Sequence, residues 1–324
     1  MVKAVVIHEI GGPEVLEWQD IDIDDPGTGE ALVRHTAVGV NFIDVYHRGG
    51  EFPLEKLPAV IGIEGAGIVE AIGDDVTEVE VGDRVAYTAG VGSYAEQRLV
   101  AADRLVRIPE GISDVDAAGI ISKGITAESM MRRCYKVKDG DTVLIHAAAG
   151  GMGLIMSQWC KHVGATVIGT TSTEAKAELA KAHGCDEVIL YSKEDFVART
   201  KEITGGALCD VVFDSVGETT FLPSIKCVKP RGTLVNYGTS SGPVPDLDMN
   251  LPYFAGSIYV TRASVIHYTV TREEVVGSAT ALWNVIQSGG ITVSVNQTYD
   301  LKDAAQAHAD LEARKTTGST VLLV

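Results

Sequence analysis

The chain has 324 residues, of which 45% are hydrophobic, and a formal net charge of −17 at pH 7. This length exceeds one ordinary domain, and the apolar fraction can fill two hydrophobic cores. The negative charge disfavours nucleic acid and anionic membrane surfaces as partners. Much of the acidity lies between Glu51 and Asp83, which we interpret as a solvated face.

The N-terminal third of the chain has the texture of an all-β domain. Between Lys3 and Val106, short apolar runs are separated by Gly and Pro, a pattern typical of a barrel. The expected strands are residues 5–8, 31–40, 65–72, 84–87 and 95–100. We place a domain boundary near residues 119–126, where a helical pattern over residues 127–134 begins.

The most informative segment runs from His146 to Gly153. It joins an apolar strand, residues 143–145, to a helix expected near Leu154. Gly150, Gly151 and Gly153 let the backbone turn sharply and approach a pyrophosphate, and the following helix offers unpaired N–H groups. Against the G-x-G-x-x-G pattern, Ala148 stands at the first Gly position. The segment predicts a dinucleotide-binding turn.

Further apolar runs follow at the spacing of a parallel crossover fold. The expected strands are residues 165–170, 188–191, 211–215, 233–237 and 257–260, with helical patterns over residues 174–183 and 194–203. We therefore predict an α/β fold with a Rossmann-type doubly wound parallel sheet.

The residues after the second strand of this sheet indicate which nucleotide binds. An NAD site usually places Asp or Glu there, whereas this chain has Thr170, Thr171, Ser172 and Thr173, followed by Lys176. Hydroxyls and a lysine can donate to a 2′-phosphate, so we predict NADPH as the cofactor. The alternative for Lys176 is a solvated helix lysine.

Two other chemistries are weighed against this interpretation. Residues 238–242 match the G-x-S-x-G of a hydrolase, but Pro243 and Pro245 follow at once and disfavour the helix that such an elbow needs. No pair of histidines has metal-binding helical spacing. The five cysteines form no C-x-x-C pair, so we expect reduced, mostly buried thiols.

No segment is apolar and long enough to span a bilayer, and the first residues lack the apolar core of a signal peptide. We therefore expect a cytoplasmic protein without membrane partners.

Six segments, in order along the chain, resemble one known family. They are Gly11-Gly12-Pro13-Glu14-Val15-Leu16, Val40-Asn41-Phe42-Ile43-Asp44-Val45-Tyr46, Gly62-Ile63-Glu64-Gly65-Ala66-Gly67, Ala147 to Gly153, Asp214-Ser215-Val216-Gly217 and Tyr259-Val260-Thr261-Arg262. The chain resembles the zinc-independent, zeta-crystallin-like NADPH:quinone oxidoreductases of the medium-chain dehydrogenase/reductase superfamily over nearly its whole length.

This resemblance implies two domains with the cofactor in the cleft between them. A GroES-like, partly open β-barrel catalytic domain would comprise residues 1–123 and 263–324, and a Rossmann NADPH-binding domain residues 124–262. It also implies a homodimer that pairs through the nucleotide-binding domains. Independently, the strand at residues 257–260 is apolar enough for an unpaired edge to be a liability.

The resemblance also bears on metal chemistry. Asn41 stands where a zinc-dependent relative has its first Cys ligand, and Ile63 where it has a His, so no zinc is predicted. Without a Lewis acid, the substrate must be intrinsically electron-poor. A quinone satisfies this requirement with modest help from hydrogen-bond donors.

Asn41 and Tyr46 are the donors we expect beside the nicotinamide, and Tyr46 could also relay a proton. The alternatives are that Asn41 caps a turn or helix and that Tyr46 only packs. Asp44 is expected to fix the geometry of its neighbours. Arg262, just after the last strand, could approach cofactor or substrate, or form an interdomain ion pair.

Carried over by the resemblance, the cofactor shell spans several segments. It would comprise Phe42, Ile43, Asp44, Val45, Tyr46, Met130, Gly150, Gly151, Met152, Gly153, Ser172, Lys176, Tyr191, Val216, Tyr237, Gly238, Thr239, Ser240, Ser241, Thr261, Arg262 and Arg314. An exposed arginine such as Arg314 often has no special role.

Two alternative functions stay open at this point. One is an enoyl or alkenal double-bond reductase, with Tyr46 as proton donor to the α-carbon. The other is a nonenzymatic NADPH-binding module, because cofactor-binding residues and residues that tune turnover overlap around Tyr46.

Overall fold

The computed structural model describes all 324 residues, and the chain forms two compact units. Unit 1 comprises Met1–Lys123, Thr271–Ala279 and Val293–Val324. Unit 2 comprises Gly124–Val270 and Thr280–Thr292.

Unit 2 is built on a six-stranded sheet in which every pair is parallel, in the order β11-β10-β9-β12-β13-β14. The strands are β9 (Thr142–Ile145), β10 (Thr166–Thr171), β11 (Glu187–Leu190), β12 (Cys209–Asp214), β13 (Val228–Asn236) and β14 (Tyr259–Arg262). The strand order reverses beside β9, which is the switch point where doubly wound sheets bind ligands. The predicted Rossmann-type sheet is confirmed.

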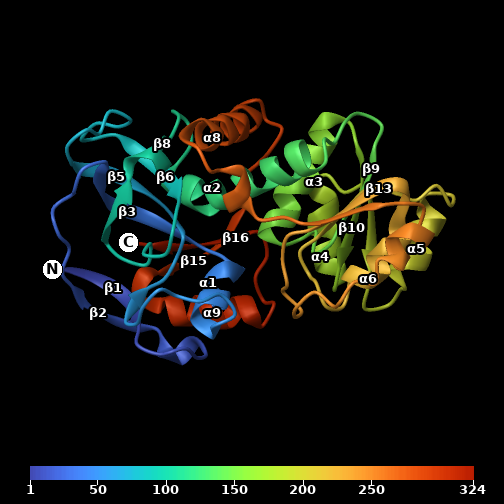
Figure 1. The fold of residues 1–324 in the computed structure, drawn as a ribbon, viewed down its shortest axis with the longest axis horizontal. Helices are drawn as coiled ribbons and strands as arrows, with labels where there is room; N and C mark the ends of the chain where they lie inside the picture. The colour runs from blue at the N-terminus through green and yellow to red at the C-terminus, as the bar shows by residue number, and fades with distance from the viewer. The chain divides into compact units, whose positions relative to one another are not determined.

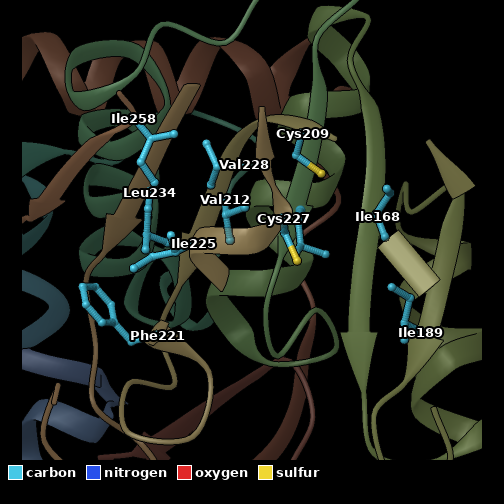
Figure 2. Close-up of a cluster of buried hydrophobic side chains, with 11 residues drawn as sticks. Ile168, Ile189, Cys209, Val212, Phe221, Ile225, Cys227, Val228, Leu234 and Ile258 are labelled. Atoms are coloured by element: carbon cyan, nitrogen blue, oxygen red, sulfur yellow. The ribbon is translucent and has the colours of Figure 1, made fainter. Parts of the chain in front are cut away.

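Helices cover both faces of this sheet, with α3 and α4 on one side of the strands and α5 and α6 on the other (Figure 1). They are α3 (Gly151–Val163), α4 (Glu174–Ala182), α5 (Phe196–Ile203), α6 (Phe221–Ser224) and α7 (Asn250–Phe254). Figure 2 shows one core cluster, in which Val212 and Leu234 of adjacent strands lie near Ile225 and Phe221 of the covering segment. Burial on both faces explains why these strands are almost continuously apolar.

Unit 1 contains two β-sheets. A small antiparallel sheet has the order β2-β1-β4, and a larger one has the order β15-β16-β3-β5-β6-β8, with β7 also paired to β3. The strands are β1 (Val2–Ile7), β2 (Glu17–Ile21), β3 (Glu30–Val40), β4 (Ala59–Val60), β5 (Glu64–Ile72), β6 (Arg84–Thr88), β7 (Gln97–Ala101), β8 (Val106–Arg107), β15 (Val295–Asp300) and β16 (Ser319–Leu323). Because β16 pairs with β3, the C-terminal segment completes the barrel-type sheet, as expected.

Four more helices belong wholly or partly to unit 1. They are α1 (Phe42–Gly49), α2 (Asp114–Glu128), α8 (Arg272–Gln287) and α9 (Ala304–Glu312). α1 begins directly after β3, and its positive-φ glycine Gly50 ends it in the left-handed conformation. The sequence patterns did not lead us to predict α1, α8, α9 or the N-terminal strand β2.

The two units divide between Lys123 and Gly124, within the expected range of residues 119–126, and this point lies inside the continuous helix α2. Two element boundaries differ from the predictions. The helical pattern over residues 127–134 divides into the end of α2 and a π-helical segment, Ser129–Cys134. The last strand begins at Tyr259 rather than at residue 257, because Gly256 and Ser257 both have positive φ. Arg262 is therefore the last residue of β14.

The cysteines follow the prediction, since all five are free and four of them are buried. None of the helices combines the length and the hydropathy that a membrane crossing requires.

Candidate functional site

In unit 2, the predicted cofactor residues gather at one edge of the sheet. Each of the six strands is followed by, or ends in, at least one of them. In strand order from β9 to β14 these are Gly150, Gly151, Met152 and Gly153; Ser172 and Lys176; Tyr191; Val216; Tyr237, Gly238, Thr239, Ser240 and Ser241; and Thr261 and Arg262. Because the strands are parallel, all of these positions lie at the carboxyl edge, where such sheets bind nucleotides.

The turn after β9 is packed too tightly for a side chain at Gly153. A Cβ there would lie 2.4 Å from the Ala147 oxygen and 2.6 Å from the Ala148 carbonyl carbon. α3 therefore approaches the turn with its backbone and starts immediately beside it, with Gly150 as N-cap. Its first-turn N–H groups and its positive dipole end face the position where a diphosphate binds in this type of fold.

Ala148 fits the position of the first motif glycine because β10 makes room for it. A Cβ on Gly169 of β10 would lie 2.7 Å from the Ala148 Cβ. Ala147 supplies the positive φ of the turn, at 53°. The departure from the glycine pattern is thus compensated by one glycine on the neighbouring strand.

The loop between β10 and α4 consists of Ser172 and Thr173, which carry hydroxyl groups and no carboxylate. Thr173 caps α4, because its Oγ1 accepts from the Lys176 N–H at 3.3 Å. Ser192 donates to the Ser172 carbonyl at 2.8 Å, which ties the loop after β11 to the loop after β10. Tyr191 stands on this second loop with 44% of its surface exposed.

A buried carboxylate holds the loop after β12, and two glycines let this loop approach the loop after β13. Asp214 accepts from the N–H groups of Val216 and Gly217 at 2.8 and 3.2 Å. A Cβ on Gly217 would lie 2.7 Å from the Gly242 oxygen, and one on Gly238 would lie 2.6 Å from the Ser215 oxygen. The backbones of the two loops are therefore in direct contact.

The same region settles the G-x-S-x-G match. Residues 237–249 form an extended loop without a helix, so Ser240 stands on no strand-to-helix elbow. The neighbouring Ser241 hydroxyl donates to the Val216 carbonyl at 2.9 Å. The geometry of a hydrolase elbow is absent, as the prolines indicated.

Buried polar groups beneath this edge were missed from the sequence. His146, at the end of β9, contacts Thr170 Oγ1 at 3.0 Å and Ser224 Oγ at 2.8 Å. Burial lowers the pKa of His146, so the ring is neutral. Asn236 donates to the Gly238 carbonyl at 2.9 Å, while its own Oδ1 is buried without a partner. The one feature of the sequence that indicates these residues is a polar side chain at the end of an apolar strand.

In unit 1, the predicted segment from Asn41 to Tyr46 forms the first turn and a half of α1. The Asp44 carboxylate accepts from the Asn41 backbone N–H at 2.8 Å, which closes the helix start. The Tyr46 ring packs against Phe42 and Phe52, with centroid distances of 6.2 and 5.3 Å. The start of α1 is therefore held by a backbone hydrogen bond and by aromatic packing.

Asp44 is fully buried and ends a hydrogen-bond chain through unit 1. Arg48 donates to His308 Nδ1 at 3.0 Å, so the remaining ring proton lies on Nε2. His308 Nε2 lies 2.9 Å from the Tyr94 hydroxyl, which in turn donates to Asp44 Oδ2 at 3.1 Å. Burial raises the pKa of Asp44 to about 7, and its Oδ1 has no partner. Arg48 is anchored by Glu312 at 2.8 Å.

Glu64 gathers three donors on one fully buried carboxylate. Its Oε1 accepts from Asn41 Nδ2 at 2.6 Å and from Lys123 Nζ at 2.8 Å, and its Oε2 accepts from the Ser122 N–H at 2.8 Å. The prediction that the acidic stretch from Glu51 to Asp83 is a solvated face is therefore wrong for Glu64. The adjacent motif glycines were the one signal that this carboxylate differs from its neighbours.

The remaining predicted residues have contrasting environments. Met130 is fully buried in the π-helical segment, with Cys134 Sγ 3.9 Å from its sulfur. Arg262 is exposed at the end of β14. Arg314 is exposed in unit 1 between α9 and β16, with a φ of 57°. No group of three or more His, Cys, Asp or Glu side chains is arranged to hold a metal ion.

Comparison with known proteins relates both units to one superfamily. Residues 151–284 match the family model of zinc-binding dehydrogenases, and residues 27–110 match that of the alcohol dehydrogenase GroES-like domain. A quinone oxidoreductase of Pseudomonas aeruginosa is 46% identical, with all of both chains covered. A 2-haloacrylate reductase of a Burkholderia species is 44% identical, covering 100% of this chain and 99% of that protein.

The solved structure of an Escherichia coli quinone oxidoreductase complexed with NADPH superposes with a TM-score of 0.97 at 42% identity. It covers 99% of this chain and 100% of its own. Identity above 40% over full length, together with the two matched domains, establishes descent and fold at once. The chain belongs to the quinone oxidoreductase family of the medium-chain dehydrogenase/reductase superfamily.

Proposed function

We propose that this protein is an NADPH:quinone oxidoreductase that works without a metal. The observation that carries the proposal is the carboxyl edge of the parallel sheet, where the α3 backbone meets the turn so closely that Gly153 has no room for a Cβ. Such an edge accepts a dinucleotide diphosphate. The relatives named quinone oxidoreductase, of full matching length, support the substrate class.

The donors at the end of β10 support NADPH over NADH. Ser172 and Lys176 can donate to a 2′-phosphate, and the loop from Thr170 to Thr173 carries no carboxylate to repel it. The NADPH in the Escherichia coli relative supports the same cofactor. When bound, the cofactor supplies hydride to the substrate. The residues of unit 2 hold and orient it.

Unit 1 provides the groups we assign to the substrate side. Asn41 donates to Glu64 with one amide hydrogen, and its second amide hydrogen can bond to a carbonyl oxygen. Tyr46 is held by its aromatic neighbours, and we assign it as a second donor. From unit 2, we assign Arg262, exposed at the end of β14, to the cofactor or substrate oxygen. Such donors suffice for a quinone, which is reduced without a Lewis acid.

A second candidate is the reduction of an activated carbon–carbon double bond. The 44% identical relative named 2-haloacrylate reductase favours it. The two functions share hydride transfer to an electron-poor conjugated system. They differ in where the additional proton goes, which is an oxygen of the quinone or the α-carbon of the double bond. Only a direct comparison of substrates separates them.

We also propose a cytoplasmic homodimer. β14 pairs with β13 on one side only, which leaves the other edge of the sheet open within the chain. Apolar side chains gather around that edge, with Tyr253 and Tyr259 both 67% exposed and Phe254 79% exposed. An open edge beside exposed aromatic residues favours pairing with a second copy.

Purified, chelator-treated protein should oxidise NADPH rapidly with simple quinones and slowly with NADH in its place. The expected rate is unchanged by the chelator, because Asn41 and Ile63 offer no zinc ligand set. The absorbance of the reduced nicotinamide gives the rate. Turnover with 2-haloacrylate or an alkenal alone would instead establish double-bond reduction, and NADPH binding without turnover would establish a nonenzymatic module.

Lys176→Ala should raise the Kd for NADPH about 10- to 100-fold, since it removes a hydrogen bond to a charged phosphate. The Kd for NADH should stay unchanged. Lys181→Ala, at the other end of α4, is the matched control and should leave both values unaltered. Fluorescence titration of the bound cofactor measures them. Equal weakening of both cofactors would contradict the assignment.

Asp44→Asn should change how stability depends on pH. The folded protein keeps the Asp44 proton up to about pH 7, whereas the unfolded chain loses it near 3.8. The carboxyl therefore lowers the free energy of unfolding as pH rises across this interval, by at most about 1.4 kcal/mol per pH unit.

Denaturant unfolding at about pH 4 and at about pH 7, close to the two ends of the interval above, measures this effect. The variant should gain stability relative to the natural protein as pH rises, and Asp22→Asn, at an exposed site, is the control for the substitution itself. A pH-independent difference for Asp44→Asn would mean that Asp44 titrates as in the unfolded chain.

The double variant Phe254→Glu/Tyr259→Glu should sediment as a monomer, because it places charge on the open edge of the sheet. The natural protein should sediment as a dimer. Val81→Glu, at a 60% exposed apolar site in unit 1, controls for the charge itself and should remain dimeric. Sedimentation velocity distinguishes these states, and a dimeric double variant would move the interface elsewhere.

A further inference from the structure

The ammonium group of Lys123 is buried with most of its hydrogen-bonding capacity unused. The side chain of Lys123 is 9% exposed, yet the one partner that the structure gives its Nζ is Glu64. An ammonium has three N–H donors, so two remain to be satisfied. Buried donors without acceptors are costly, and such groups call for a ligand or an ordered water.

The hydrogen bond to Glu64 fixes the position of the Lys123 ammonium group. The carboxylate is itself fully buried and accepts Lys123 Nζ and Asn41 Nδ2 on the same oxygen, Oε1. The two donor nitrogens therefore both lie within 2.8 Å of one oxygen atom. This shared acceptor is the reason for assigning the free N–H groups of Asn41 and Lys123 to the same substrate oxygen.

We propose that Lys123 is a catalytic residue that binds and protonates the oxygen of the substrate as it is reduced. The inference rests on the proposed quinone reductase function and deepens it. Reduction of a quinone to a hydroquinone adds two electrons and two protons. A hydride accounts for both electrons and one proton, so one proton must come from elsewhere.

Lys123 supplies that second proton. One N–H bond of the ammonium breaks as the O–H bond of the hydroquinone forms, and the neutral amine then regains a proton from water. Before transfer, the positive charge stabilises the oxyanion that develops on the substrate, in a site where low solvent access strengthens the interaction. Asn41 can bond to the same oxygen but has no proton to give.

Two variants separate this role from packing. Lys123→Met removes the charge at similar volume, but it leaves Glu64 buried and unpaired, which destabilises proteins strongly. The double variant Lys123→Met/Glu64→Gln removes both charges, so it leaves no unpaired buried charge and should still fold. Lys302→Met, at an exposed lysine of the same unit, is the control and should match the natural protein.

Steady-state turnover is measured with 1,4-benzoquinone and with its tetramethyl derivative, which is the weaker oxidant. Loss of an oxyanion donor should reduce kcat by about 10²–10³-fold with the weaker oxidant and by less with benzoquinone. A purely structural role would reduce both rates by the same factor, and that result would overturn the proposal.

A binding measurement gives a readout that does not depend on turnover. 4-Nitrophenol mimics the hydroquinone anion, and its phenolate absorbs visible light. The natural protein, saturated with NADP⁺, should bind it as the phenolate, with an apparent pKa for the bound phenol below its value in water. The double variant should lose this shift.

The two arms distinguish failure of this inference from failure of the proposed function. Quinone turnover with unchanged phenolate binding in the double variant would overturn the role of Lys123 and leave the function intact. If the natural protein reduces no quinone, the function fails, and the phenolate shift alone decides whether Lys123 forms an oxyanion site.

Discussion

The burial of the Glu64 carboxylate is the constraint on which the substrate side of the molecule depends. An ion with no exposed surface is stable only when its oxygens are fully hydrogen-bonded. Asn41 at the start of α1 and the consecutive residues Ser122 and Lys123 of α2 meet this need from two segments of unit 1. Gly39 leaves the space, since a Cβ there would lie 2.2 Å from Glu64 Oε1. The position of Asn41 is therefore fixed by the demands of the carboxylate.

The nucleotide side depends on a different constraint, which is the direction of the strands. Six parallel strands bring loops from between Thr142 and Arg262 to one edge, and the loops after β12 and β13 are close enough that Gly217 and Gly238 cannot carry side chains. Gly169 shows how local the requirement is, because it makes room for Ala148. The glycine pattern reflects positions where the backbone leaves no room for a side chain. That room can also be provided by a glycine on an adjacent strand.

The strands of unit 2 and the residues at their ends could be predicted because burial on both faces leaves long apolar runs between turns. α1 could not, because its eight residues from Phe42 to Gly49 are too short to establish a period and its start depends on the Asp44 contact with Asn41. Glu64 and Lys123 escaped for a related reason. Apart from the motif glycines beside Glu64, the sequence carries no sign that these two charged side chains are buried, so the fold was needed to show that they pair.

The hydrogen-bond chain from Arg48 to Asp44 has a consequence for the order in which the molecule folds. It passes through His308, which lies 260 residues from Arg48, and β3 likewise takes β16 as its neighbour. During synthesis, the parallel sheet of unit 2 is complete once Arg262 has emerged from the ribosome. The larger β-sheet of unit 1 can be completed only after the last residues of the chain have been made. Its strand pairs are far apart in sequence, so the entropy of closing a large loop is lost before their stabilising contacts form. The N-terminal segment is thus synthesised first but completes its fold last. Until β16 has been made, the edge of β3 that it covers can pair with strands of other chains.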